Sequence, residues 1–224
     1  MSAPCATDRM IFFENLVKTF RRTRVLDGIG LSVEPGERVA LIGSNGAGKT
    51  TLIRCLLGEY TCGGVVRVTG LDPRRNRTLV LNRIGFVPQL PPPLKMPVGQ
   101  LIEFSASLCG VAPARMIGIA EELGLDVAAV RSRQFLRLSG GMKQKLLIAI
   151  ALGRDTHVLL MDEPAANLDP EARGIFFDLL ARRQENTTML ISCHRLSEMS
   201  AIITRVVEMD MGRIMIDRPN QEEA

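Results

Sequence analysis

A glycine-rich segment near the N-terminus narrows the range of possible folds more than any other part of this sequence. Its residues, from Gly43 to Thr50, fit the pattern G-x-x-x-x-G-K-T of a phosphate-binding loop. They follow Arg38–Gly43, predicted to be a short buried strand, and lead into a predicted helix, Thr50–Leu57. This strand–loop–helix context favours a phosphate-binding loop over a chance glycine-rich turn. The sequence therefore predicts an α/β fold with a phosphate-loop core and a parallel sheet.

The residue types of the loop suit the binding of a nucleotide. Glycines allow successive backbone N–H groups to turn inward and form an anion nest at the positive end of the following helix. In such loops the lysine, here Lys49, reaches the β and γ phosphates, and the hydroxyl of Thr50 meets Mg²⁺. ATP and Mg²⁺ are the predicted cofactors. The predicted nucleotide-binding residues of this segment are Gly43, Ser44, Asn45, Gly46, Ala47, Gly48, Lys49, Thr50 and Thr51.

Two adjacent carboxylates follow a second apolar stretch. Val158–Asp162 has four apolar residues and ends in an aspartate, as expected of a buried parallel strand. We expect Asp162 to enter the Mg²⁺ shell beside the phosphates. Glu163 comes one residue later and is placed to polarise a water in line with the γ phosphate, which is general-base chemistry. An acidic pair alone would be weak support, but together with the loop it indicates a hydrolytic site.

The rest of the chain alternates between strand-like and helix-like patterns. Four prolines in Gln89–Pro97 forbid a regular helix and mark a change of subdomain. A helical insertion is predicted from Val98 to about Gly124, continuing into Leu146–Leu152. The other predicted strands are Met10–Val17, Val25–Val33, Val65–Val68, Ile84–Val87, His157–Met161, Thr188–Ser192 and a hairpin of Val206–Met209 with Arg213–Ile216; Gly70–Arg77 is predicted as a loop and Pro170–Arg183 as a helix.

Composition excludes several classes of protein. The 224 residues are 46% hydrophobic and 23% charged, which is ordinary globular usage. The longest uncharged apolar run, Leu146–Gly153, is far shorter than a membrane span, and Met1–Met10 lacks a secretory signal, so the cytoplasm is the expected compartment. The five cysteines form no CxxC spacing, so free thiols are expected. Basic clusters at residues 21–24 and 74–77 are interpreted as solvated faces, and no direct nucleic-acid partner is expected.

Between the loop and the acidic pair stands a Ser-Gly-Gly turn. It lies within Leu138–Gln144 and opens an apolar helix. Alone it could be an N-cap, with Ser139 accepting from the first helical N–H groups. Together with the loop, the acidic pair, Gln89 and His194, in this order, it resembles the ATPase domain of the ABC superfamily. The resemblance covers about Ile11 to Ile216, and the Ser-Gly-Gly signature is its most specific element.

The resemblance implies roles for residues outside the loop. Gln89 would contact Mg²⁺ and the attacking water and would sense a transmembrane partner. Ser139, Gly140 and Gly141 would bind the γ phosphate held by the opposite subunit. Asn167–Asp169 would cross the dimer interface. The implied metal ligands are Thr50, Gln89 and Asp162, and the implied catalytic residues are Glu163, His194 and Gln89.

Two of these assignments compete with a structural role. Phe20 matches the aromatic residue that stacks on adenine in the family, but an aromatic residue after a strand is often buried in the core. His194, implied to touch the γ phosphate and to steady Glu163, could be a structural histidine. Its place at the end of the strand expected after the Asp162 strand favours the functional role, because doubly wound sheets place ligand groups there.

Some residues depart from the commonest family pattern. Met142 replaces a glutamine, Lys145 stands where arginine is frequent, and Ala165-Ala166 replaces a pair with a hydroxyl group. None of these changes removes a catalytic group, so activity is expected. The sulfur-containing residues near the C-terminus match no copper-ligand spacing and are expected to pack: Met189, Cys193, Met199, Met209, Met211 and Met215.

The sequence thus predicts a single ABC ATPase domain over residues 1–224. Residues 10–89 and 157–217 would form the core with an N-terminal antiparallel β layer, and 90–156 a helical subdomain. The predicted function is that of a transporter motor, an exporter by preference. It would work as a homodimer, or as a heterodimer with a second ATPase subunit, on transmembrane permease subunits at the inner face of the cell membrane. A soluble ABC ATPase, such as one of iron–sulfur assembly, is the alternative.

Overall fold

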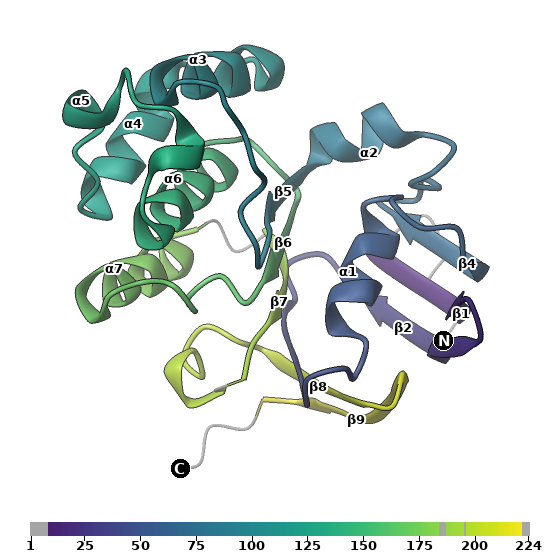
Figure 1. The fold of residues 1–224 in the computed structure, drawn as a ribbon. Helices are drawn as coiled ribbons and strands as arrows, with labels where there is room; N and C mark the ends of the chain where they lie inside the picture. The colour runs from purple at the N-terminus through teal and green to yellow at the C-terminus, as the bar shows by residue number, and fades with distance from the viewer. Residues whose placement is uncertain (1–8, 184–186, 195, 221–224) are drawn as a thin grey trace. The chain divides into compact units, whose positions relative to one another are not determined.

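The computed structural model describes residues 9–183, 187–194 and 196–220. The chain divides into two compact units. The first unit comprises Met1–Ile84, His157–Asp162 and Gln184–Ala224, and the second unit comprises Gly85–Thr156 and Glu163–Arg183. Figure 1 shows the elements of each unit. The expected boundaries of the core and the helical subdomain remain a prediction.

A three-stranded antiparallel sheet in the first unit contains β1 (Ile11–Phe20), β2 (Thr23–Val33) and β4 (Gly63–Val68), with β1 in the middle (Figure 1). Residues Ile11 and Phe13 point to its buried side, as alternation in a half-buried strand requires. The predicted N-terminal β layer is therefore confirmed. It is longer than expected, because β1 runs three residues beyond Val17 to the turn before β2.

The second sheet has six strands in the order β5-β6-β7-β3-β8-β9. The strands β6, β7, β3 and β8 run parallel, and β9 is antiparallel to β8. Every residue of β6 and β7 is buried, which explains their continuous apolar sequences. The predicted α/β fold class with a parallel sheet is confirmed. The bounds are β3 Arg38–Gly43, β5 Ile84–Val87, β6 Val158–Asp162, β7 Thr188–Ser192, β8 Arg205–Asp210 and β9 Arg213–Pro219.

The first unit also contains α1 (Lys49–Leu56), which follows the phosphate loop as expected, and α2 (Arg77–Arg83), which the sequence did not predict. The turn before α2 is built on Asp72, whose carboxylate accepts the backbone N–H groups of Arg74 and Arg75. Only Val80 of this helix is buried. A single buried residue leaves no apolar periodicity in the sequence, which explains why α2 was missed.

The second unit is helical apart from the residues of β5. Its core gathers apolar side chains of four helices and of the 3-10 turn Phe135–Arg137, among them Ile102, Met116, Phe135 and Leu146. The predicted helical insertion is confirmed, although it breaks into shorter helices at Gly110 and Gly124, which both have positive φ. The bounds are α3 Val98–Cys109, α4 Pro113–Glu122, α5 Val127–Val130, α6 Gly140–Leu152 and α7 Pro170–Ala181.

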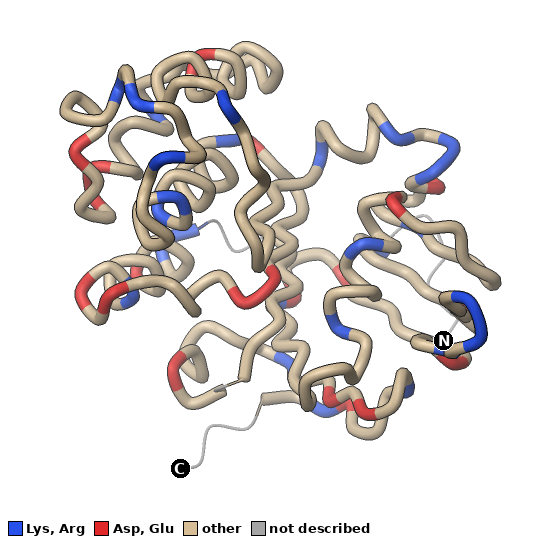
Figure 2. Tube along the Cα trace, in the orientation of Figure 1, with Lys and Arg blue, Asp and Glu red and all other residues tan. Residues whose placement is uncertain are grey.

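The charged residues of each unit are of mixed sign. Figure 2 shows basic residues at the turn between β1 and β2 and before α2, with acidic residues close to both. At the first turn, Asp27 pairs with Arg24 and with Arg213, and these arginines lower the pKa of the Asp27 carboxyl, Arg213 more than Arg24. Arg24 of the first cluster is thus partly neutralised by a local partner, and the other arginines of the two clusters are exposed. This agrees with their interpretation as solvated faces.

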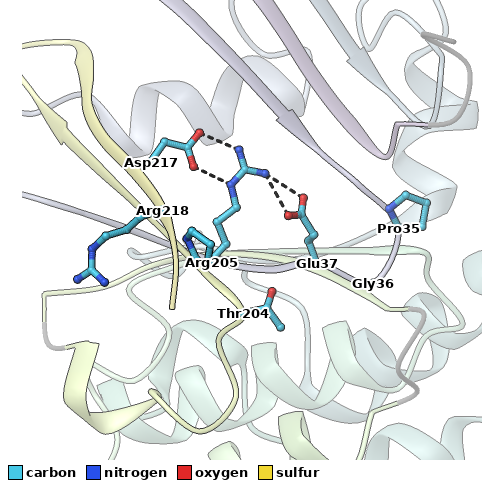
Figure 3. A pocket seen from close by; sticks show the side chains of 8 residues that line it. Pro35, Gly36, Glu37, Thr204, Arg205, Asp217 and Arg218 are labelled. Atoms are coloured by element: carbon cyan, nitrogen blue, oxygen red, sulfur yellow. Dashed lines mark hydrogen bonds and ion pairs between the residues drawn. The ribbon is translucent and has the colours of Figure 1, made fainter. Parts of the chain in front are cut away.

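A pocket of about 630 Å³ lies in the first unit where β3 and β8 begin. Figure 3 shows that Arg205 lies between Asp217 and Glu37, while Arg218 points away from both. The guanidinium donates two bonds of 2.7 Å to Asp217 and bonds of 3.1 and 3.0 Å to Glu37. These bonds, Asp217 first, raise the pKa of Arg205 further above its usual range. Because the ligands of such sheets bind at the carboxyl ends of the strands, we interpret this pocket as structural.

Candidate nucleotide-binding site

The phosphate loop is held in shape by glycines that no other residue could replace without strain. Gly43 has φ +148°, and a β-carbon there would stand 2.2 Å from the carbonyl oxygen of Met209 in β8. Gly48, at the start of α1, has φ +106°, and its β-carbon would meet Leu26 at 2.8 Å. The backbone therefore approaches its neighbours more closely than a side chain permits, as the glycine pattern predicts.

The loop also bonds to the hairpin of β8 and β9. The backbone N–H of Gly212 donates to the carbonyl of Ala47 over 3.1 Å, and Ser44 Oγ lies 3.5 Å from Asp210 Oδ1. Both Asp210 and Gly212 lie at the turn of the hairpin. The loop is thus stabilised by Asp210 and Gly212, which lie far from it in the sequence. The sequence analysis did not predict this contact.

Lys49 is the first residue of α1, and its side chain is buried against the loop. Its ammonium Nζ donates to the carbonyl oxygens of Gly43 over 2.6 Å and Ser44 over 3.1 Å. A buried ammonium group must be paired with hydrogen-bond acceptors, and these two carbonyls supply them. The same bonds place the positive charge inside the loop, together with its backbone N–H groups.

Asp162 lies at the same edge of the sheet as the loop. Across β3, β7 and β6, residues Leu41, Ser192 and Asp162 lie side by side in register. The loop begins at Gly43, two residues beyond Leu41. Ser192 Oγ donates to Asp162 Oδ1 over 2.6 Å, and the carboxylate is buried. Carboxylate and hydroxyl oxygens are ligands that Mg²⁺ accepts, so Asp162 and the half-buried Thr50 fit a magnesium site.

Phe20 lies outside the core, with 38% of its surface exposed at the end of β1. The edge of its ring meets Tyr60, with centroids 5.0 Å apart, and Lys18 Nζ lies 4.6 Å from its ring centroid. The core-packing alternative for Phe20 is therefore wrong. Phe20, Tyr60 and Lys18 form a small cluster of two aromatic rings and one ammonium group. The sequence analysis missed this cluster, because Tyr60 lies far from Phe20 in the chain.

His194 is exposed and follows β7 by two residues. It lies two positions beyond Ser192, the partner of Asp162. The first unit thus brings together the loop, Asp162 and the segment that leads to His194. It does so at the carboxyl ends of parallel strands, where this class of fold binds nucleotides.

The signature residues lie at the start of α6 in the second unit. Ser139 is the N-cap, and its Oγ accepts the backbone N–H of Met142 over 3.2 Å. Ser139 and Gly140 are exposed, and a β-carbon at Gly140 would meet nothing within 4 Å. An exposed N-terminus of a 13-residue helix offers free N–H groups and a positive dipole end to an anion.

The remaining predicted residues also belong to the second unit. Gln89 is half-buried and lies two residues beyond the end of β5. Glu163 is half-buried and has φ +48°, a left-handed conformation uncommon outside glycine. Asp169 caps α7 by accepting the backbone N–H of Ala172 over 2.8 Å. Its ion pair with Lys145, followed by this backbone bond, lowers the pKa of the Asp169 carboxyl.

Three of the sulfur-containing residues near the C-terminus are packed in the core. Met189, Met199 and Met209 are buried in the core, whereas Met211 and Met215 are exposed. Among residues 9–183, 187–194 and 196–220, no group of three or more His, Cys, Asp or Glu side chains could hold a metal ion. Of the five cysteines expected to be free, four are free thiols in the structure, and Cys5 lies outside the described residues.

The fold and the loop define a phosphate-loop protein that binds a nucleotide at the carboxyl edge of a parallel sheet. A family model described as ABC transporter matches residues 26–166. The chain belongs to the ABC transporter family, as an ATP-binding subunit with ATPase activity. In the part of the chain that the structure describes, no helix has the length and apolar character needed to cross a membrane.

Proteins of known function support this assignment. The chain is 35% identical to the Nod factor export ATP-binding protein I of Paraburkholderia xenovorans, over 91% of this chain and 68% of that protein. It is 35% identical to the L-cystine transport system ATP-binding protein TcyN of Escherichia coli, over 90% of this chain and 87% of that protein.

Solved structures show the same fold. An ATP binding subunit of an ABC transporter superposes with a TM-score of 0.84 at 23% identity, over 94% of this chain and 90% of that one. A bacterial Atm1-family ABC exporter with ATP bound has a TM-score of 0.83 at 26% identity, over 94% of this chain and 39% of that one.

Proposed function

We propose that this chain is the motor subunit of an ABC transporter. Two ATPase subunits close head to tail on two ATP molecules, and their closure rearranges separate transmembrane permease subunits. The observation that carries the proposal is the exposed N-terminus of α6, where Ser139 and Gly140 present a helix end suited to an anion. In the head-to-tail dimer this anion is the γ phosphate of the ATP held by the opposite subunit.

Binding of ATP belongs to the first unit in this proposal. The backbone N–H groups of residues 43–51 and the Lys49 ammonium group bind the phosphates, and Phe20 stacks on the adenine. In this proposal Thr50 and Asp162, together with Gln89 of the second unit, would hold Mg²⁺, which when bound neutralises charge on the phosphate oxygens. The bond from Ser192 orients the Asp162 carboxylate toward this role.

Hydrolysis needs a group that accepts a proton. We assign this role to Glu163, which accepts a proton from the attacking water. The oxygen of that water bonds to the γ phosphorus while the bond from the γ phosphorus to the β–γ bridging oxygen breaks. A general base of this kind contributes roughly 10² to 10⁴ in rate. The proposal also gives His194 the role of contacting the γ phosphate and steadying Glu163.

Contact with the permease belongs to the second unit. In α3, Phe104 and Leu108 are 53% and 65% exposed and lie one helical turn apart, so they form an apolar stripe. Such a stripe supports docking of a membrane subunit, with attachment of this chain to the inner face of the membrane. The relatives include both an export protein and a phosphonates import protein of Pseudomonas syringae, so export stays a prediction from the sequence.

The dimer can be tested on the isolated chain. Glu163→Gln keeps the shape of the side chain and removes the base, so it is expected to bind ATP, hydrolyse it 10² to 10⁴ times more slowly, and accumulate as a dimer on gel filtration with ATP. Ser139→Arg added to this variant should leave ATP binding intact and abolish the dimer, because a bulky charge blocks the helix end. If the double variant dimerises as well as Glu163→Gln does, the head-to-tail arrangement is wrong.

A further inference from the structure

A glutamine in α6 is completely buried. Gln144 has 0% of its surface exposed, and its side-chain Nε2 donates to the carbonyl oxygen of Pro164 over 2.8 Å. Its Oε1 is also buried and has no hydrogen-bond partner among the described residues. Burial of an amide with only one of its two polar atoms bonded costs free energy that an apolar residue would not. The bond to Pro164 therefore calls for a role beyond filling the core.

The acceptor lies next to the proposed base. Pro164 follows Glu163, and residues Glu163 to Asp169 form a turn between β6 and α7, here called the base turn. Inside it, the backbone N–H of Ala166 donates to the carbonyl of Glu163 over 3.2 Å. Glu163 itself has φ +48°, and such a conformation persists only where its surroundings enforce it. Gln144 supplies one such enforcing bond, directly after the strained residue.

The base turn also touches α6 at its other end. Lys145 Nζ lies 2.8 Å from Asp169 Oδ2, and the lysine side chain is largely buried. Gly141 is so close that a β-carbon would stand 3.1 Å from the carbonyl oxygen of Asn167. Three residues of α6, Gln144, Gly141 and Lys145, thus contact the beginning, the middle and the end of the base turn, all within the second unit.

We propose that Gln144 is a positioning residue for ATP hydrolysis, which holds the Pro164–Ala165 peptide, directly after Glu163, so that the base turn and α6 move as one body. Ser139 is the N-cap of α6, so a movement of the signature would be transmitted through α6 and Gln144 to the backbone next to Glu163. This inference rests on the proposed role of Glu163 as the base. A misplacement of about 1 Å at a catalytic group can lower the rate 10²-fold, so a lost positioning bond is expected to be visible in kcat.

The test compares two variants of similar size. Gln144→Met removes the donor and should lower kcat about tenfold or more, with KM for ATP and nucleotide affinity within twofold of the parent. Gln144→Glu places a carboxyl group there, whose pKa rises on burial. Its protonated form can donate to Pro164, so its kcat relative to the parent should rise as the pH falls from 8 to 6. The kcat of Gln144→Met, divided by that of the parent, should not change with pH over the same range.

Two controls separate positioning from stability. Phe135→Leu lowers the stability of the same unit from a side chain that belongs to its apolar core, and it should leave kcat unchanged. Gln144→Met added to Glu163→Gln should lower the residual rate by less than twofold, because a residue that acts through the base has nothing left to position.

Three results would overturn the inference: a kcat within twofold of the parent in Gln144→Met, an equal loss in Phe135→Leu, or a flat pH ratio in Gln144→Glu. If Gln144→Met does not fold, the pH profile of Gln144→Glu decides alone. Near-parent hydrolysis by Glu163→Gln would instead overturn the proposed base itself. If Glu163→Gln hydrolyses ATP slowly while Gln144→Met is fully active, only the proposed role of Gln144 is wrong.

Discussion

Lys49 shows how one residue can serve both the fold and the ligand. Its ammonium group bonds to the carbonyls of Gly43 and Ser44, which are the first two residues of the loop. A phosphate chain that enters the loop competes for the same donors, and an ammonium group has three of them. The lysine therefore needs no movement across the protein to exchange carbonyl partners for phosphate oxygens.

Lys49→Ala is expected to weaken ATP binding roughly 10- to 100-fold, since a hydrogen bond to a charged group is worth about 1.5–3 kcal/mol. Affinity for ADP should fall less, because the γ phosphate is absent and the backbone N–H groups of the loop survive. Titration with fluorescent ATP and ADP measures both. Equal affinity for ATP in the variant and the parent would contradict the assigned role of the loop.

Two glycines of the loop should respond differently to substitution. At Gly43 a β-carbon would collide with the backbone of Met209, so Gly43→Ala is expected to cost roughly 3 kcal/mol or more of stability. At Gly46 the same β-carbon would meet nothing within 4 Å, so only the positive φ opposes it, at about 1 kcal/mol. Thermal or denaturant unfolding compares the two variants. Equal losses would show that the close approach at Met209 is not limiting.

The thiol of Cys55 should be the least reactive of the four cysteines that the structure describes. Burial raises the pKa of Cys55 to about 12, and the thiolate is the form that reacts with alkylating agents. Iodoacetamide at pH 8, followed by mass spectrometry, should label the half-buried Cys109 well before Cys55. Labelling of Cys55 in the folded protein at the rate of Cys109 would contradict the packing around α1.

Among the helices and strands, the sequence predicted the bounds best for apolar strands of the parallel sheet. The bounds of β3, β5 and β7 agree with the predicted ranges, because continuous apolar runs between turn residues have clear ends. The helix α2 was not predicted, since a helix with one buried residue has no apolar periodicity to detect. The apolar run alone begins at Leu146, but the Ser-Gly-Gly turn predicted to open a helix is where α6 begins, with Ser139 as its N-cap.

The candidate site was predictable only in part. The loop, Asp162 and Glu163 could be found because each follows a strand in a recognisable pattern. The bond from Ser192 to Asp162 could not, because it depends on the register between two strands that are distant in the sequence. Gln144 was hidden for another reason: a polar residue on a helix is expected to face solvent, and only packing against the base turn reveals that it does not.

Arg205 in β8 forms ion pairs with Asp217 in β9 and with Glu37 just before β3, so its loss should destabilise this part of the sheet. Arg205→Met leaves Glu37 and Asp217 facing each other without their shared cation, and we expect the melting temperature to fall by about 2–8 °C. Nucleotide affinity should change little, since the residue lies at the opposite edge of the sheet from the loop. The conservative Arg205→Lys should recover only part of the loss, because lysine cannot bond to both carboxylates in the same way. An unchanged melting temperature in Arg205→Met would contradict this account.

At the scale of the whole molecule, the two units divide the proposed work. The first carries the phosphate loop and the buried Asp162, and the second carries the signature helix and the base turn. Asp162 and Glu163 are adjacent in the chain yet fall in different units. The peptide bond between them therefore joins the proposed metal ligand of one unit to the proposed base of the other.

Docking on the permease should depend on the second unit alone. Leu108→Arg on α3 is expected to reduce co-purification with the transmembrane partner in mild detergent while the isolated chain keeps its ATPase rate, because a charge interrupts the exposed apolar stripe. Leu79→Arg is the matched control, since Leu79 on α2 is 55% exposed and belongs to the first unit. Equal recovery of the partner with both variants would place the contact elsewhere.

The support of the phosphate loop by the hairpin of β8 and β9 has a consequence for how the protein is made. The carbonyl of Met209 lies against Gly43 of the loop, and the carbonyl of Ala47 in the loop accepts the N–H of Gly212. Both contacts need residues of the hairpin, although the loop itself ends at Thr51. A ribosome adds about 5–20 residues each second, so the loop spends roughly 10–30 seconds in the growing chain without its contacts to the hairpin. During synthesis the nucleotide site is therefore completed only after Gly212 has been added, and ATP can begin to stabilise the protein only from that point.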